Sequence, residues 1–174
     1  PSLSAAFAAP SLVRGETTQL TFTLTNPNST VALTGLSFTG ELTPGLPLAN
    51  TVESRNTCGG TLTAAANNRT LALSGGTVSA GGKCEVQVNV TGLEIGEQML
   101  QTSNLNSVEG GLGNAVKLNL STLCAVKPVI VTQNPTGCGE VSLSTTARAG
   151  FAYQWFKDGV AVAEATAANY TARA

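Results

Sequence analysis

The sequence contains no histidine and few charged or aromatic residues. Without histidine, a catalytic serine or cysteine lacks its usual general base, and zinc lacks its commonest nitrogen ligand. Charged residues make up 11% of the chain, the formal net charge is -1, and the cations are scattered. No basic stripe is present to follow a phosphate backbone, so we expect no nucleic acid as a partner.

Long hydrophobic runs and clusters of acidic residues are also missing. No apolar stretch approaches the roughly 20 residues that a membrane-spanning helix requires, so we expect no direct insertion into a membrane. The 10 acidic residues show neither the alternating spacing of a calcium loop nor that of a catalytic pair. We therefore predict no enzymatic activity, no cofactor and no metal site. An aromatic content of 5% argues against an extended sugar-stacking platform.

What the sequence does have is a repeated alternation of apolar and hydroxyl-bearing residues. In residues 17–26, Leu20, Phe22 and Leu24 alternate with threonines, which is typical of a strand with one buried and one solvent-facing side. The same period of two recurs at residues 32–39, 70–74, 84–90 and 116–120. The apolar positions of these segments predict a common core that includes Leu20, Phe22, Leu24, Phe38, Val86 and Val88.

Prolines and glycines divide this alternation into separate strands. Pro10 interrupts the first segment, and residues 42–47 hold two prolines and a glycine, which predicts a crossing between two sheets. Glycine pairs at 75–76 and 81–82 predict turns. Seven or eight strands in about 120 residues is the usual size of an immunoglobulin-like antiparallel β-sandwich, so we predict an all-β fold.

A second region begins where the strand pattern stops, at residues 122–128. We predict a sandwich domain over residues 1–122 and a second, incomplete immunoglobulin-like β module over residues 123–174. Asp158 and Gly159 predict a hairpin turn in this module. Its expected strands lie at residues 129–133, 140–146, 151–157 and 169–172.

Tyr153 and Trp155 have the same parity on one of these strands, so both side chains face one side. A sandwich requires such a residue at its centre, and we therefore assign Trp155 to a core rather than to a sugar-binding surface. Four strands leave an open edge and one open face, which would favour self-association or a covering neighbour.

Four cysteines are present, an even number without a CxxC pair. Together with the absence of histidine, this favours disulfides and an oxidising compartment over zinc. Cys58 and Cys84 each lie beside a Gly-Gly pair at the mouth of a strand, and we expect them to be bridged. Cys124 and Cys138 either bridge each other, which we favour, or Cys138 pairs with a residue of the missing strands.

Over residues 1–121, the order and spacing of five segments resemble the conserved repeat domains strung along bacterial cell-surface and adhesin-like proteins. These segments are LTFTLTNPN at 20–28, LTGLSF at 33–38, LTPGL at 42–46, CGGT at 58–61 and GGKC at 81–84. The resemblance implies an immunoglobulin-like sandwich, no catalytic activity, and export by a bacterium to the cell surface or the extracellular space.

Residues 128–174 resemble a different family, the bacterial immunoglobulin-like modules with a Tyr-x-Trp-x-Lys-x-Gly strand. The matching segments are VSL at 141–143, YQWFKDGV at 153–160 and NYT at 169–171. The last strands of that family are missing from the segment.

These observations predict a non-catalytic structural or adhesive module, a stalk or spacer, of a large secreted or cell-surface bacterial protein. Its partners would be neighbouring modules of the same polypeptide and a surface glycan or protein. The alternative is a carbohydrate-binding or other ligand-binding accessory module of an extracellular enzyme.

Overall fold

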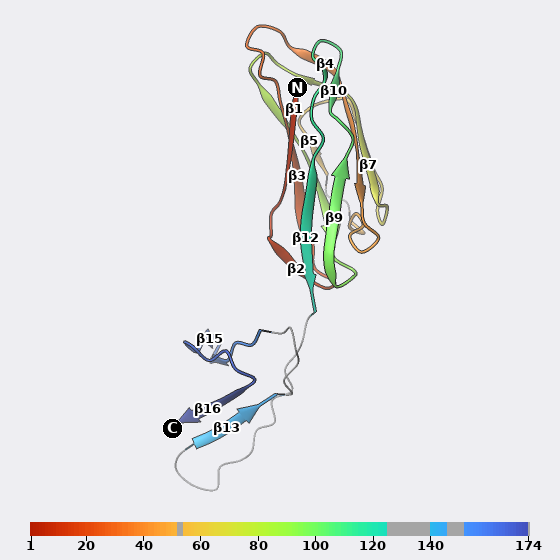
Figure 1. The fold of residues 1–174 in the computed structure, drawn as a ribbon. Coiled ribbons are helices and arrows are strands. Elements are labelled where there is room, and N and C mark those ends of the chain that lie inside the picture. The colour runs from red at the N-terminus through yellow and green to blue at the C-terminus, as the bar shows by residue number, and fades with distance from the viewer. Residues whose placement is uncertain (52–53, 125–139, 146–151, 174) are drawn as a thin grey trace. The chain divides into compact units, whose positions relative to one another are not determined.

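The computed structural model describes residues 1–51, 54–124, 140–145 and 152–173 (Figure 1). These residues form sixteen strands and no helix, which confirms the all-β prediction. The chain divides into two compact units, Pro1–Ala125 and Val126–Ala174, and each unit is described by itself.

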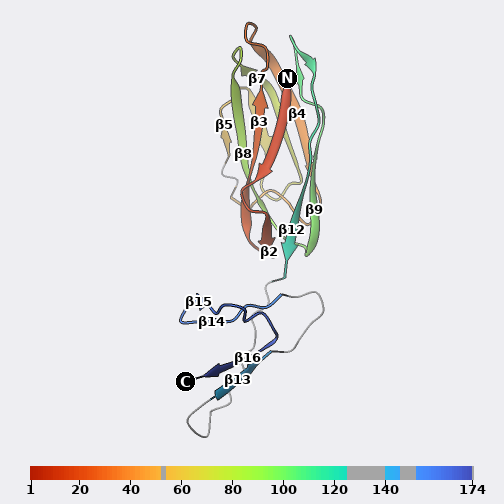
Figure 2. The same ribbon diagram turned by 60° about the vertical axis from the view of Figure 1, so that its left-hand side comes forward.

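Two β-sheets lie face to face in the first unit, as both ribbon views show (Figures 1 and 2). One sheet has the order β1–β3–β8–β5, in which the strands are β1 Ser2–Phe7, β3 Thr17–Thr25, β8 Lys83–Thr91 and β5 Arg55–Asn56. The other has the order β6–β7–β4–β9–β12–β2, formed by Thr61–Ala64, Thr70–Val78, Leu33–Leu42, Gly96–Thr102, Lys117–Leu123 and Ser11–Val13. A short pair, β10 Asn106–Ser107 and β11 Gly111–Leu112, extends from β4.

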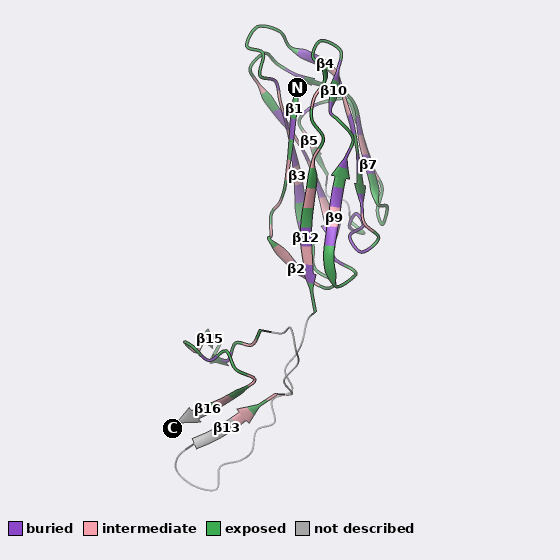
Figure 3. Ribbon diagram, viewed as in Figure 1, coloured by how far each residue is buried: buried purple, intermediate pink, exposed green. Residues whose placement is uncertain are grey.

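The core lies between the two sheets, and along β3 and β8 buried residues alternate with half-buried or exposed ones (Figure 3). Leu20, Phe22 and Leu24 of β3 are completely buried, and Val86 and Val88 lie opposite two of them on β8. Burying each large apolar side chain of this kind stabilises the fold by about 1.5–3 kcal/mol. The sandwich is therefore held together mainly by residues that follow the period of two.

Phe38 joins the two layers. It belongs to β4 in the second sheet, and its ring centroid lies 5.1 Å from that of Phe22 in the first. A tilted pair at this distance adds a favourable aromatic contact to the burial of both rings.

Pro10 marks the point where the chain moves from one sheet to the other. Before it, β1 pairs with β3, and after it, β2 pairs with β12. Proline has no N–H to donate to a ladder, so it is tolerated at such a crossing. The β2–β12 pair is parallel, whereas the other described pairs are antiparallel, and the sequence did not predict this pairing.

The second crossing lies where the two prolines and the glycine predicted it. After β4 ends at Leu42, Leu48 pairs with Val90 of β8 in the opposite sheet. Gly45 is required here because a Cβ at this position would lie 2.5 Å from Oε1 of Gln98.

The glycine pair at 75–76 is not a turn, contrary to the prediction. Both glycines lie within β7, beside register shifts in the β4–β7 ladder. A Cβ on Gly60 would overlap the carbonyl oxygen of Ser74 and the backbone of Gly75 and Gly76. Gly60 therefore allows its backbone to approach β7 closely beside the irregular part of the ladder.

The second unit contains two short two-stranded sheets. Glu140–Ser144 (β13) pairs with Asn169–Arg173 (β16), and Phe156–Lys157 (β14) pairs with Val160–Ala161 (β15). Asp158 and Gly159 form the predicted turn with φ values of 51° and 81°, and a two-residue turn of this kind requires positive φ at both positions. The predicted strand at 129–133 lies outside the described residues.

Candidate functional site

A disulfide joins Cys58 and Cys84 in the first unit, and both residues are buried. Their Cα atoms lie 5.0 Å apart, a usual separation for a disulfide. Cys84 lies near the start of β8, opposite Leu24, so the bond ties the segment after β5 to a central strand. These two sulfur atoms therefore have a structural role and supply no reactive thiol.

Cys124 differs from this pair because it is a free, exposed cysteine directly after β12. Cys138 lies outside the described residues, so the Cys124–Cys138 bridge that the sequence favoured stays a prediction. A disulfide requires Cα atoms within about 7 Å of each other. The number of cysteines in a sequence does not say which of them come that close.

Trp155 is buried within the second unit, with 8% of its surface exposed. Its ring stacks on Tyr170 at a centroid distance of 6.1 Å, and its Nε1–H donates a hydrogen bond of 2.8 Å to the carbonyl oxygen of Ala167. Tyr153 is half-buried. Trp155 is thus covered by residues of its own chain, and the self-association or covering neighbour expected at the open edge stays a prediction.

Titratable groups form no evident reaction centre in the described part of the chain. No three of its cysteine, aspartate and glutamate residues gather closely enough to hold a metal ion. Nor does this part contain a helix of the length and apolarity needed to cross a membrane.

Glu109 is the residue with the clearest electrostatic perturbation. Its carboxylate accepts hydrogen bonds of 2.6 Å from both the hydroxyl and the backbone N–H of Thr34. These two bonds favour the charged form and lower the pKa of Glu109 below its ordinary value of 4.5. The contact joins the turn between β10 and β11 to the start of β4 and is structural.

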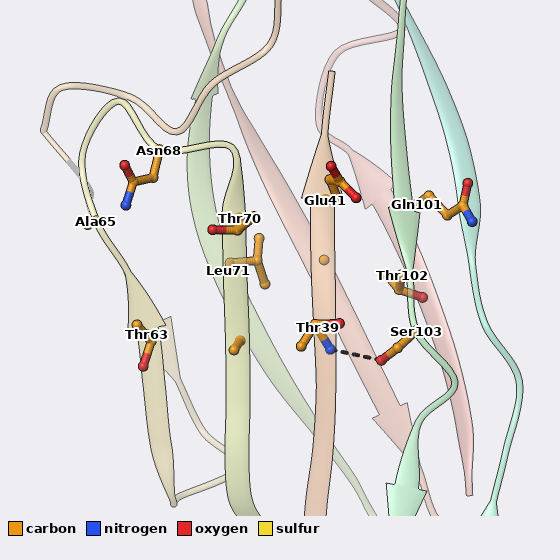
Figure 4. A pocket seen from close by; sticks show the side chains of 12 residues that line it. Thr39, Glu41, Thr63, Ala65, Asn68, Thr70, Leu71, Gln101, Thr102 and Ser103 are labelled. Atoms are coloured by element: carbon orange, nitrogen blue, oxygen red, sulfur yellow. Dashed lines mark hydrogen bonds between the residues drawn. The ribbon is translucent and has the colours of Figure 1, made fainter. Parts of the chain in front are cut away.

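A groove of about 560 Å³ lies on the outer face of the second sheet, over β6, β7, β4 and β9 (Figure 4). Its lining comes from four strands and the segments next to them, and it includes four threonines and one charged residue, Glu41. The described lining is formed by Thr39, Gly40, Glu41, Thr63, Ala65, Asn68, Thr70, Leu71, Ala72, Gln101, Thr102 and Ser103.

Register places the groove residues in rows that run across the strands. Thr70, Glu41 and Gln101 are successive partners on β7, β4 and β9, and they form one row. Thr39 lies between Ala72 and Ser103 in the next row, and its N–H donates a 2.9 Å hydrogen bond to the Ser103 hydroxyl. Hydroxyl, carboxylate and amide groups are therefore exposed side by side.

No local sequence pattern marks a groove residue as functional. The period of two does predict that Thr39 and Glu41 point to the same side of β4. Their neighbours come from segments that lie about 30 and 60 residues further along the chain, and no local pattern fixes that pairing.

The first unit is an immunoglobulin-like β-sandwich module, and comparisons with known proteins agree with this class. The chain belongs to the family described as "Domain of unknown function (DUF7933)", whose model matches residues 1–122. No curated protein matches the chain.

Two solved structures show the same fold at low sequence identity. A cohesin module from a family 33 glycoside hydrolase of Clostridium perfringens aligns with a TM-score of 0.54 and 10% identity, covering 71% of this chain and 97% of that one. The full-length major pilin SpaD from Corynebacterium diphtheriae aligns with a TM-score of 0.50 and 14% identity, covering 98% of this chain and 46% of that one. The specific repeat family that the sequence resembled stays a prediction.

Proposed function

We propose that the chain is a non-catalytic stalk or adhesive module of a secreted or cell-surface bacterial protein, and that its sandwich domain resists pulling forces. One observation carries the proposal. β2, the second strand of the sandwich, and β12, its last strand, form a parallel pair, so the chain runs in one direction along both of them.

This pairing has a mechanical consequence. Residue 1 and the end of β12 lie at opposite ends of the sandwich (Figures 1 and 2). Force applied between those ends pulls β2 and β12 past each other along their axes. The three registered pairs and the 2.8 Å bond from the Arg14 N–H to the Leu123 carbonyl are then loaded together rather than one at a time.

The disulfide supports the same role because it limits how far the domain can extend. It encloses the strands β6 and β7, and its cysteines are 26 residues apart in the sequence. A bond of this kind persists in oxidising compartments, in agreement with an extracellular location. Cohesin modules and pilins share this fold, which makes a role among neighbouring modules or protein partners reasonable.

Single-molecule force spectroscopy on the full 174-residue chain, held at its two ends, tests the proposal. The variant Arg14→Pro removes the N–H that bonds to Leu123, whereas Arg14→Ala keeps it and removes the side chain. We expect the proline variant to unfold at a clearly lower force than the alanine variant. Equal unfolding forces would show that the β2–β12 pair does not carry the load.

A ligand-binding accessory role is the second candidate, and the polar groove is the observation that favours it.

A further inference from the structure

The groove on the outer face of the second sheet presents side-chain hydrogen-bonding groups that no atom of the described residues uses. The side chains of Glu41, Thr70 and Gln101 form one of its rows, and none of them has a hydrogen-bond partner in the described part of the chain. The side chains of Thr63 and Asn68 on its rim are equally unpaired there. We propose that this groove binds a neutral oligosaccharide.

The chemistry of the lining selects this class of ligand. A sugar hydroxyl is both donor and acceptor, and the groove offers a carboxylate that accepts, amides that do both, and hydroxyl groups that do both. Glu41 is the one charged side chain among the described lining residues, so the groove repels phosphate, sulfate and uronate groups. Threonine and amide side chains offer little to a purely apolar ligand.

The geometry of the sheet suits a chain-like ligand that lies across the strands. Adjacent strands are about 4.8 Å apart, so Thr70, Glu41 and Gln101 repeat polar groups at roughly that interval along one row. Ala72 lies in the neighbouring row between Thr63 and Thr39, where its small side chain takes up little space on the floor of the groove. The volume of about 560 Å³ is within the range of small-molecule sites.

The same features predict weak binding by a single module. No aromatic ring lines the described part of the groove, so a sugar gains hydrogen bonds but no stacking. We expect millimolar affinity for one site. A protein that repeats such a module would convert this affinity into firm adhesion through multivalency.

Backbone NMR titration of the full chain with neutral hexasaccharides of glucose, N-acetylglucosamine and mannose tests the inference. With at least one of them, the amide signals of Glu41, Thr70 and Gln101 should shift in a saturable way. The signals of Thr21 and Gln87, which face outward on the opposite sheet, should not shift.

Two groove variants and one matched control sharpen the titration. Ala72→Arg fills the floor and should abolish binding. Glu41→Gln keeps the shape but removes the charge, and should weaken binding about tenfold, because hydrogen bonds to a charged group are stronger than neutral ones. Glu85→Gln changes a glutamate on the outward side of β8 and should leave the affinity unchanged.

Three results would overturn the inference. One is the absence of saturable shifts with all three hexasaccharides at tens of millimolar. Another is saturable binding that survives Ala72→Arg. The third is preferential binding of an acidic oligosaccharide, such as hexagalacturonate. None of them bears on the pulling experiment, because the groove residues are not part of the β2–β12 pair.

Discussion

The two units of this chain have similar alternating sequences but very different interiors. In the sandwich, each sheet supplies an apolar face that the other sheet covers, and Leu20, Phe22 and Leu24 are completely buried. In the second unit, Trp155 and Ala165 are the buried hydrophobic residues among those described, and the sheets have two strands each. Alternation therefore specifies strands, but a core also requires a second layer, and an isolated strand pair is only marginally stable.

Damage to the sandwich core is the most direct test of this difference between the two interiors. Phe22→Ala removes a ring that is completely buried against Phe38 and leaves a cavity. We expect the sandwich to lose about 3–5 kcal/mol of unfolding free energy, measured by chemical denaturation followed by circular dichroism. Fluorescence of Trp155, the single tryptophan, reports the second unit and should be unaffected under native conditions.

The control for Phe22→Ala is Thr21→Val on the same strand. Thr21 is half-buried on the outer side of β3, and valine keeps its shape and its β-branched character. We expect a change within about 0.5 kcal/mol. Equal losses for the two variants would mean that the period of two does not identify the core.

Removing the disulfide is the next largest change to the sandwich. Because the cysteines are 26 positions apart in the sequence, replacing Cys58 and Cys84 by serine should cost about 3–4 kcal/mol through the entropy of the unfolded chain. The fold should be retained, because the alternating strands supply the core independently. Thermal unfolding followed by circular dichroism measures this as a lowered Tm.

Force spectroscopy gives a second measure of the same bond. Adding a reductant should lengthen the unfolding step of the wild-type sandwich by roughly 90 Å, the extended length of the 26 residues that the bond encloses. An unchanged step length would show that the disulfide is not present in the protein. The serine variant serves as the control, since reductant should not alter its step.

A smaller change addresses the second unit. Trp155→Phe keeps an aromatic ring against Tyr170 but removes the N–H that bonds to Ala167. We expect a local loss of about 1–2 kcal/mol, measured as faster amide hydrogen exchange in residues 152–173, with the sandwich unchanged. Phe156→Leu is the control, because Phe156 is 63% exposed and its replacement should alter exchange little. Equal effects of the two variants on exchange would show that the Trp155 hydrogen bond does not stabilise this unit specifically.

These differences also separate what the sequence could predict from what it could not. The core positions of β3 and β8 follow from local alternation, and the turn at Asp158 and Gly159 follows from its two residues. The parallel β2–β12 pair and the groove depend on register between distant segments, which no local pattern contains. Gly75 and Gly76 gave a wrong turn prediction, because the positive φ of Gly75 serves a bulge as well as a turn.

The smallest expected effect concerns the contact between Glu109 and Thr34 at one end of the sandwich. Hydrogen bonds from Thr34 favour the Glu109 carboxylate, so its pKa in the folded protein lies below the ordinary value of 4.5. A carboxyl group with a lowered folded-state pKa contributes stability above its unfolded pKa, and this contribution is lost as the pH falls through the folded pKa. The contact should therefore be intact at neutral pH and weaken only in acid below pH 4.5.

Thr34→Val tests this contact because valine removes the hydroxyl but keeps the backbone N–H. The NMR titration of the Glu109 carboxyl should move toward 4.5 without reaching it, since the hydroxyl is the largest of the causes that lower its pKa and the backbone bond remains. Thr39→Val, on the same strand but without contact to Glu109, should leave the titration unchanged. Stability should change little in either variant, because the Glu109 carboxylate is exposed to solvent and an exposed contact adds little. A Glu109 titration that Thr34→Val does not alter would assign the lowered pKa to the backbone instead.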